Sequence, residues 1–190
     1  MIKKKCDKND DYWNLQETMK HDFDRVLPYG ELRVDRWEKA KFCGFGNDTS
    51  VYDSAIIMGD VKVGNNVWIG PNTLLDGSGA CLLIGDYCSI SADVHIYTHD
   101  TIDFCLSGGK VSKKTGGVTI GSFTYIAPKV IISMGISLGN HCLVCTNSFV
   151  NDSFSDNSIV AGTPAKKIGE VIITEEGEVV RKYYSEIQNE

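Results

Sequence analysis

The sequence contains a six-residue repeat of apolar residues that runs, with two interruptions, from Phe45 to Val150. Fifteen positions carry an aliphatic or aromatic residue in this phase: Phe45, Val51, Ile57, Val63, Ile69, Leu75, Ile84, Ile90, Ile96, Ile120, Ile126, Ile132, Leu138, Val144 and Val150. The residue after each is often small, and the residue four positions after it is often small or β-branched. A period of six matches neither an α-helix nor an ordinary alternating strand. It is typical of a solenoid in which short strands stack coil upon coil.

Three hexads are expected to make one coil of a three-sided prism. The apolar residue of each hexad then points into the prism. The small residue beside it lies at a corner, where glycine tolerates unusual backbone angles. Fifteen hexads make about five coils, and a strand spacing of about 4.8 Å predicts a prism about 24 Å tall.

The hexads resemble those of a known family when they are taken together with three segments, Ile126–Ala127, Met134–Gly139 and Ala161–Lys166. The family is the left-handed β-helix, or hexapeptide-repeat, acyltransferases. The similarity is to the sugar, maltose, galactoside and xenobiotic O-acetyltransferases, which also occur in polysaccharide biosynthesis clusters. The resemblance covers about residues 45–168 and implies an all-β fold, a left-handed parallel β-helix.

The chain is predicted to have three parts. Residues 1–44 form an N-terminal helix and connector, residues 45–165 the β-helix catalytic domain with a loop at 98–117, and residues 166–190 a C-terminal extension. Within the first part, residues 10–27 predict a helix that caps the open end of the prism, with an apolar stripe that packs on the first coil or on a neighbouring subunit. Residues 171–184 predict a β-hairpin with a glycine turn.

Composition narrows the classes of partner and compartment. With 190 residues, one domain is the natural expectation, and a net charge of −6 disfavours nucleic acid as a partner. No apolar run is long enough to span a membrane, and the start of the sequence lacks the apolar region of a signal peptide. The seven cysteines do not have the paired spacing of metal sites, so we interpret them as reduced thiols in a cytoplasmic protein that binds no metal.

Acyl transfer to a hydroxyl needs a base, and a neutral histidine can serve at pH 7. His99 lies where the repeat breaks into the loop, and this is where the resemblance places the family's general base. His95, at an expected corner, is the reserve candidate, and a loop histidine without a role is the alternative for either. Asp100 is a candidate to orient the imidazole of His99, or it is simply solvated.

Two residues are candidates to contact the acceptor. Asp76 begins the segment Asp76–Gly79, where the repeat slips by three residues. This segment is interpreted either as a turn or as an acceptor contact, because the resemblance implies an acidic residue about one coil before the catalytic histidine. Asn72 is the second acceptor candidate.

The resemblance also implies a coenzyme site along the late hexads. Its candidate residues are Tyr125, Ala127, Gly135, Thr146, Lys166 and Lys167. Two features depart from the family pattern. Pro128 has no N–H to donate, and Thr146 is bulkier than the family's usual residue at a position whose backbone N–H reaches the coenzyme.

The function predicted from these features is transfer of an acetyl group from acetyl-CoA to a hydroxyl of a sugar or nucleotide-sugar, or alternatively to a sugar amine. The expected assembly is a homotrimer with active sites at the subunit boundaries. A catalytically silent β-helix scaffold is the alternative. A γ-type carbonic anhydrase is disfavoured, because its zinc needs three histidines and no histidine lies between His21 and His95.

Overall fold

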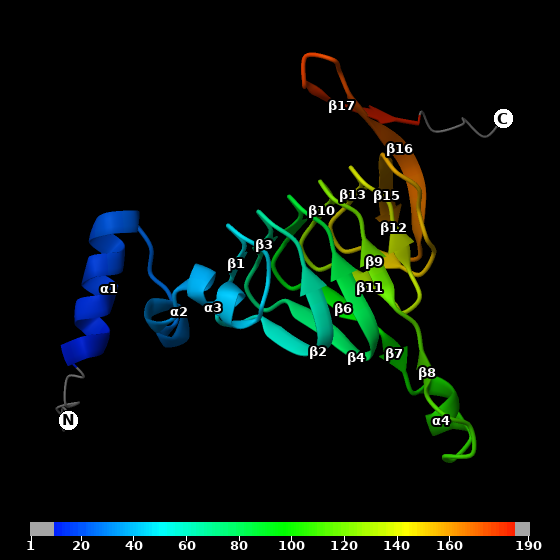
Figure 1. The fold of residues 1–190 in the computed structure, drawn as a ribbon, viewed down its shortest axis with the longest axis horizontal. Coiled ribbons are helices and arrows are strands. Elements are labelled where there is room, and N and C mark those ends of the chain that lie inside the picture. The colour runs from blue at the N-terminus through cyan, green and yellow to red at the C-terminus, as the bar shows by residue number, and fades with distance from the viewer. Residues whose placement is uncertain (1–9, 185–190) are drawn as a thin grey trace, which may run out of the picture.

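The structure is a computed structural model that describes residues 10–184. The predictions made for the first residues and for the last six therefore lie outside the described part of the chain. The body is a prism of stacked short strands, with helices at one end and a hairpin at the other (Figure 1).

The first face of the prism is a stack of six parallel strands. They are β1 (Ser50–Val51), β3 (Trp68–Ile69), β5 (Ser89–Ile90), β10 (Tyr125–Ile126), β13 (Leu143–Val144) and β15 (Ser158–Gly162). Val51 pairs with Ile69, and Ile126 with Val144, so that partners lie eighteen residues, or three hexads, apart. The prediction of three hexads per coil is therefore confirmed. The strand β15 extends the stack beyond the fifteen hexads.

The other two faces belong to one continuous sheet, because two long strands run round the corner between them. These are β2 (Ile56–Val63) and β4 (Leu74–Ile84). The second face adds β6 (His95–Tyr97), β11 (Ile131–Ile132) and β14 (Phe149–Val150), and the third adds β9 (Val118–Ile120) and β12 (Ser137–Leu138).

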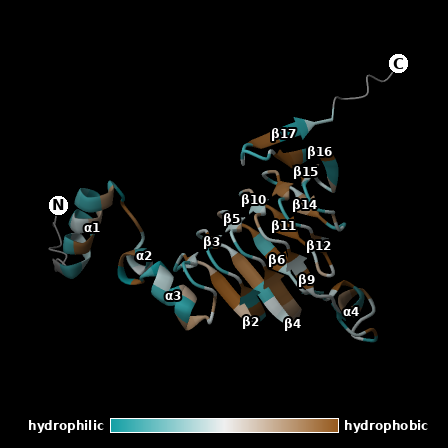
Figure 2. Ribbon diagram, turned by 45° about the horizontal axis from the view of Figure 1, so that its top comes forward, coloured by the Kyte–Doolittle hydropathy of each residue, from teal (hydrophilic) through white to brown (hydrophobic). Residues whose placement is uncertain are grey.

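The hexad residues fill the prism. Fourteen of the fifteen are buried, and Ile57 is partly buried and packs against the same core. Hydrophobic residues accordingly gather on the strands of the prism in Figure 2. Burial of this continuous apolar column, rather than any single contact, stabilises the fold.

Small polar residues stack at one inner corner of the prism. The hydroxyl of Thr124 donates to the carbonyl of Gly139, and the Cys88 thiol lies 3.2 Å from the carbonyl of Gly121. Burial raises the pKa of the Cys88 thiol to about 11. At these two positions, the small polar residue four places after the hexad start contacts the backbone of the next coil. The described cysteines are all free thiols, as predicted.

Three helices precede the prism: α1 (Asp10–Phe23), α2 (Tyr29–Arg33) and α3 (Arg36–Phe42). The predicted helix ends four residues early, because Asp24 takes a left-handed backbone conformation with φ of 53°. The prediction that this helix caps the prism is wrong. It packs against α2 and stands away from the prism (Figure 1), whereas α3, in a segment left unassigned by the sequence, packs on β1 with Ala40 buried.

Two charged residues fasten these helices to the first corner of the prism. The Lys39 ammonium donates to the carbonyls of Tyr52, Asp53 and Ala55 at 2.6–3.0 Å. The buried Glu31 carboxylate accepts from the backbone N–H groups of Asp53 and Ser54, both at 3.1 Å. The backbone N–H and C=O groups of the turn at residues 52–55 therefore find their hydrogen-bond partners in the helices. These bonds close the open end of the prism.

The excursion between the ninth and tenth hexads is ordered. Its two sides, β7 (His99–Asp100) and β8 (Lys114–Thr115), pair antiparallel, and the short helix α4 (Ile102–Leu106) lies at the tip. The ribbon projects from the body near the bottom of Figure 1. The loop predicted at 98–117 therefore contains two short strands and a helix.

The C-terminal hairpin is present, as predicted. It consists of β16 (Ala165–Ile173) and β17 (Val179–Tyr183), with Gly177 at a φ of 85° in the turn. The strand β16 begins earlier than expected and pairs antiparallel with β15. Among residues 10–184, no helix has the length and apolar character to span a membrane.

Candidate active site

The two long strands contain the break in the repeat. Gly59 of β2 pairs with Gly77 of β4, and the next pair is Val61 with Leu82. The strand β2 advances two residues between these pairs while β4 advances five, so three extra residues bulge from β4. The predicted slip of three residues is thus absorbed as a β-bulge beside the second face.

This bulge lies against the start of the ribbon and places Asp76 beside His99. The Nδ1 atom of His99 is 3.4 Å from Oδ2 of Asp76. The carboxylate is 4% exposed and the imidazole 26% exposed. Nδ1 itself is buried without a hydrogen bond of good geometry, and a distance of 3.4 Å is slightly longer than an ideal one. A small movement brings the two atoms into hydrogen-bonding distance, as is common at catalytic pairs without substrate.

The Asp76 carboxylate stays ionised in this buried position. Burial raises its pKa. Two hydrogen bonds lower it, one from the Ser78 hydroxyl and one from the Ser78 backbone N–H. The nearby charges of His99 and Lys113 also lower it, and together these effects outweigh that of burial. The net effect is a pKa below the ordinary value for an aspartate. At neutral pH, His99 therefore faces a negative charge.

His99 opens on an apolar groove of about 580 Å³. The groove is lined by Tyr97, His99, Asp100, Thr101, Ile102, Ile131, Ser133, Met134 and Phe149. We call it the His99 groove. It runs from the base of the ribbon along the outer side of the second face.

The other candidates for the base and its partner lie elsewhere. His95 is the first residue of β6, where it pairs in register with Ile131, rather than a corner residue, and its Nδ1 is 3.4 Å from the hydroxyl of Tyr97. The Asp100 carboxylate accepts from the backbone N–H of Ile102, the first residue of α4. It is Asp76, rather than Asp100, that lies beside Nδ1 of His99 in this structure, because the bulge brings it across from the preceding coil.

The two acceptor candidates are separated. Asn72 lies in the turn between β3 and β4, where its backbone N–H donates to the hydroxyl of Ser54. Asp76 lies four residues further on, at the opposite end of the second face. Only Asp76 is in contact with His99.

The coenzyme candidates also fall at different places. Gly135 lies at the base of the ribbon, where its N–H donates to Gly116, whose own N–H donates to the carbonyl of Thr98. Tyr125 is on the first face, and Ala127 and Thr146 are in two stacked turns that follow it. Within a single chain, Tyr125, Ala127 and Thr146 do not line the His99 groove.

The two lysines are each paired with an acidic residue. The Lys166 ammonium is 3.3 Å from Asp152, and that of Lys167 is 2.8 Å from Glu170. The hydrogen bond that the Lys167 ammonium donates to Glu170 raises the pKa of Lys167. They are neighbours on β16 and therefore point to opposite sides of the strand.

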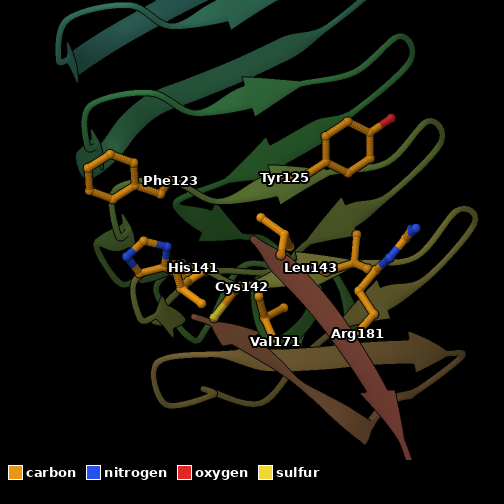
Figure 3. A pocket seen from close by; sticks show the side chains of 9 residues that line it. Phe123, Tyr125, His141, Cys142, Leu143, Val171 and Arg181 are labelled. Atoms are coloured by element: carbon orange, nitrogen blue, oxygen red, sulfur yellow. The ribbon is translucent and has the colours of Figure 1, made fainter. Parts of the chain in front are cut away.

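A cavity of about 660 Å³ lies between the first face and the hairpin (Figure 3). Tyr125, Leu143 and Arg181 are among its lining residues. It also contains His141, whose ring stacks on Phe123 at 4.7 Å. This histidine has an aromatic neighbour where His99 has a carboxylate, so the His99 groove is the better candidate for an active site. Among residues 10–184, no three His, Cys, Asp or Glu side chains converge in a metal-binding group.

Comparison with known proteins agrees with this architecture. No protein-family model matches the chain. It is 29% identical over 140 residues to the probable acetyltransferase Rv3034c of Mycobacterium tuberculosis, across 73% of this chain and 44% of that protein. It is 27% identical over 139 residues to the carnitine operon protein CaiE of Salmonella agona, across 65% of each chain. The match thus spans less than two thirds of the length of either relative.

Solved structures share the fold. The N-acyltransferase AntD from Bacillus cereus, in complex with dTDP and 3-hydroxybutyryl-CoA, superimposes with a TM-score of 0.59 and 26% identity over 65% of this chain and 70% of AntD. The hexapeptide-repeat acetyltransferase VCA0836 from Vibrio cholerae, in complex with acetyl-CoA, superimposes with a TM-score of 0.50 and 18% identity over 97% and 94% of the two chains. The relatives and neighbours confirm the resemblance predicted from the hexads: the chain has the β-helix fold of the hexapeptide-repeat acyltransferases.

Proposed function

We propose that this protein transfers an acetyl group from acetyl-CoA to a hydroxyl or amine of a sugar or nucleotide-sugar. The observation that carries the proposal is the pairing of His99 with the buried Asp76 carboxylate at the edge of a groove. The relatives named above support the reaction class, since two of them are acyltransferases whose structures contain an acyl-CoA. The dTDP in the AntD complex supports a nucleotide-sugar as the acceptor class.

The pair has the arrangement that a general base needs. A carboxylate at Nδ1 favours the imidazole tautomer with its proton on Nδ1, and this leaves Nε2 free as an acceptor. The oxygen of the acceptor hydroxyl, or the nitrogen of the acceptor amine, attacks the carbonyl carbon of the thioester. Nε2 of His99 takes the proton from that oxygen or nitrogen as the new bond forms. Asp76 stabilises the imidazolium that forms. When the carbon–sulfur bond breaks, the proton passes from Nε2 to the departing thiolate of coenzyme A.

A second copy of the chain completes the site in this proposal. His99 is reached from the second face, whereas Tyr125, Ala127 and Thr146 lie on or beside the first face. A coenzyme held by the latter residues meets His99 only where the first face of one prism stands beside the second face of another. A contact between the first face of one chain and the second face of another is heterologous, and cyclic symmetry repeats it until a ring closes. The proposed assembly is a homotrimer, in which this contact occurs three times.

The function is tested by measuring release of the coenzyme A thiol from acetyl-CoA in the presence of a panel of acceptors. The panel contains free sugars, dTDP- and UDP-sugars, and the 4-amino analogues of the same nucleotide-sugars. Mass spectrometry of the product distinguishes an ester from an amide. Turnover of at least one acceptor is expected. Absence of both turnover and acetyl-CoA binding by calorimetry would instead favour the scaffold.

A further inference from the structure

One hydroxyl lies at the centre of the contacts that bring Asp76 to His99. Thr98 is fully buried and directly precedes His99. Its hydroxyl donates to the carbonyl oxygen of Asp76 at 2.7 Å, and it accepts from the N–H groups of Gly79 and Ala80 at 3.1 and 3.2 Å. A threonine hydroxyl has one proton to donate and two lone pairs to accept, so its capacity is fully used.

The three partners of Thr98 lie in or beside the bulge in β4. Gly79 and Ala80 belong to the bulge and have no pairing partner on β2, and their N–H groups donate to Thr98 instead. The same hydroxyl holds the backbone of Asp76 on the other side of the bulge. His99 directly follows Thr98 in the chain. Thr98 therefore determines where the Asp76 carboxylate lies relative to His99.

Gly79 shows how closely the bulge approaches the histidine. A Cβ atom at this position would lie 2.5 Å from the carbonyl oxygen of Thr98 and 2.6 Å from Cβ of His99. Both distances are far shorter than van der Waals contact. Any side chain at position 79 would thus push His99 away from the bulge, and glycine is required for the contact.

We propose that Thr98 is a positioning residue, whose hydroxyl holds the bulge of β4 so that the Asp76 carboxylate faces Nδ1 of His99, with Gly79 providing the space. This inference rests on the proposed function, because it assigns a purpose to the pair that the function uses. It also explains the slip of three residues in the repeat: the extra residues build the active site rather than the prism.

The test substitutes Thr98 by valine, which has nearly the same shape without the hydroxyl, and by serine, which keeps it. Thr124→Val is the matched control. Thr124 is also buried and also bonds to the next coil, donating to Gly139 and accepting from Cys142, both at 3.1 Å, but it lies in the inner corner away from the bulge. A loss of stability that Thr98→Val and Thr124→Val share is attributed to the removal of a buried hydroxyl and not to the positioning of Asp76.

The first measurement is the tautomer of the neutral His99 imidazole, read by 15N NMR on the full-length chain. Wild type, Thr98→Ser and Thr124→Val should hold the proton on Nδ1. Thr98→Val should show a mixture of tautomers, and Asp76→Asn should move the proton to Nε2. A folded Thr98→Val protein with the wild-type tautomer would overturn the proposal. If Thr98→Val does not fold, Gly79→Ala tests the same contact, and an unchanged tautomer there overturns it equally.

The second measurement is kcat with the acceptor found in the thiol-release assay. Thr98→Val should lower kcat by up to about a hundredfold with little change in the KM for acetyl-CoA, since misplacement of about 1 Å has effects of this size. In an Asp76→Asn background the same substitution should add no further loss. Full additivity would contradict the proposal. The tautomer measurement needs no turnover and therefore tests the positioning role of Thr98 independently of activity. A wild-type protein without acetyltransferase activity would refute the proposed function but would not decide the positioning role.

Discussion

The Nδ1 atom of His99 lies 3.4 Å from Oδ2 of Asp76, although 23 residues and one turn of the prism separate them in the chain. Asp76 pairs in register with Tyr97 across β4 and β6, so that the stacking of coils, rather than local sequence, brings the carboxylate to the imidazole. The relationship predicts how each residue of the pair affects rate, pH dependence and stability.

Removing the imidazole should abolish base catalysis and little else. His99→Ala is expected to keep the fold and the affinity for acetyl-CoA while kcat falls by roughly 10²–10⁴-fold, the usual contribution of a general base. Steady-state kinetics with calorimetry of acetyl-CoA binding measures both quantities. His95→Ala is the control: its ring contacts Tyr97 rather than a carboxylate, so it should affect kcat much less. Near-full turnover by His99→Ala would mean that another group is the base.

Replacing the carboxylate by an amide should reduce the rate through the tautomer of His99. The Asp76→Asn side chain can donate to Nδ1 and hold the proton on Nε2, where a base cannot use it. A triad carboxylate replaced in this way costs up to about 10⁴-fold in kcat. Asp100→Asn, which alters a carboxylate bonded to Ile102 instead, should leave kcat within a small factor of wild type. The reverse ranking of the two variants would assign the orienting role to Asp100.

The same carboxylate should make stability depend on pH in one direction. Since the folded protein lowers the pKa of Asp76, the ionised group contributes stability that is present above its unfolded pKa of about 3.9. That contribution is lost as the pH falls through the lowered pKa. Urea unfolding of wild type and Asp76→Asn between pH 7 and pH 3 should show a difference in unfolding free energy that shrinks at the acid end. A difference independent of pH would show that the ionised form is not favoured by folding.

The assembly prediction follows from the placement of the coenzyme candidates. Multi-angle light scattering at micromolar concentration should give three times the chain mass of 20.9 kDa. If so, mixing inactive His99→Ala chains with inactive chains altered at Tyr125 should restore part of the activity, because some boundaries then contain both native residues. A monomer with full activity would exclude a site shared between subunits.

The ammonium of Lys39 should be needed to close the end of the prism. Lys39→Met leaves the carbonyls of Tyr52, Asp53 and Ala55 without their donor, and the unfolding free energy should fall by roughly 1.5–3 kcal/mol. Lys41→Met, an exposed position on the same helix, should change it little. Chemical denaturation of both variants measures the difference, and equal stabilities would show that α3 packs through its apolar contacts alone.

The hexad pattern by itself determined the prism, its core residues and its three hexads per coil. A repeat of this kind predicts structure well because each hexad contacts only the hexads one coil away, so that local spacing decides which side chains point inward. Ile126 and Val144 could be placed in one stack from their eighteen-residue spacing alone. The same pattern indicated the candidate site, since His99 and Asp76 both lie where the repeat is interrupted.

Only the tertiary structure decided which residues meet at those interruptions. The extra residues in β4 have no periodic rule, and their path depends on the hydroxyl of Thr98, which sequence reasoning passed over because a threonine in a strand is unremarkable. For the same reason Asp76 rather than Asp100 faces the imidazole, and α3 rather than α1 closes the prism. The separation of Tyr125 from His99 is likewise a property of the three-sided cross-section, because residues of successive hexads lie on different faces.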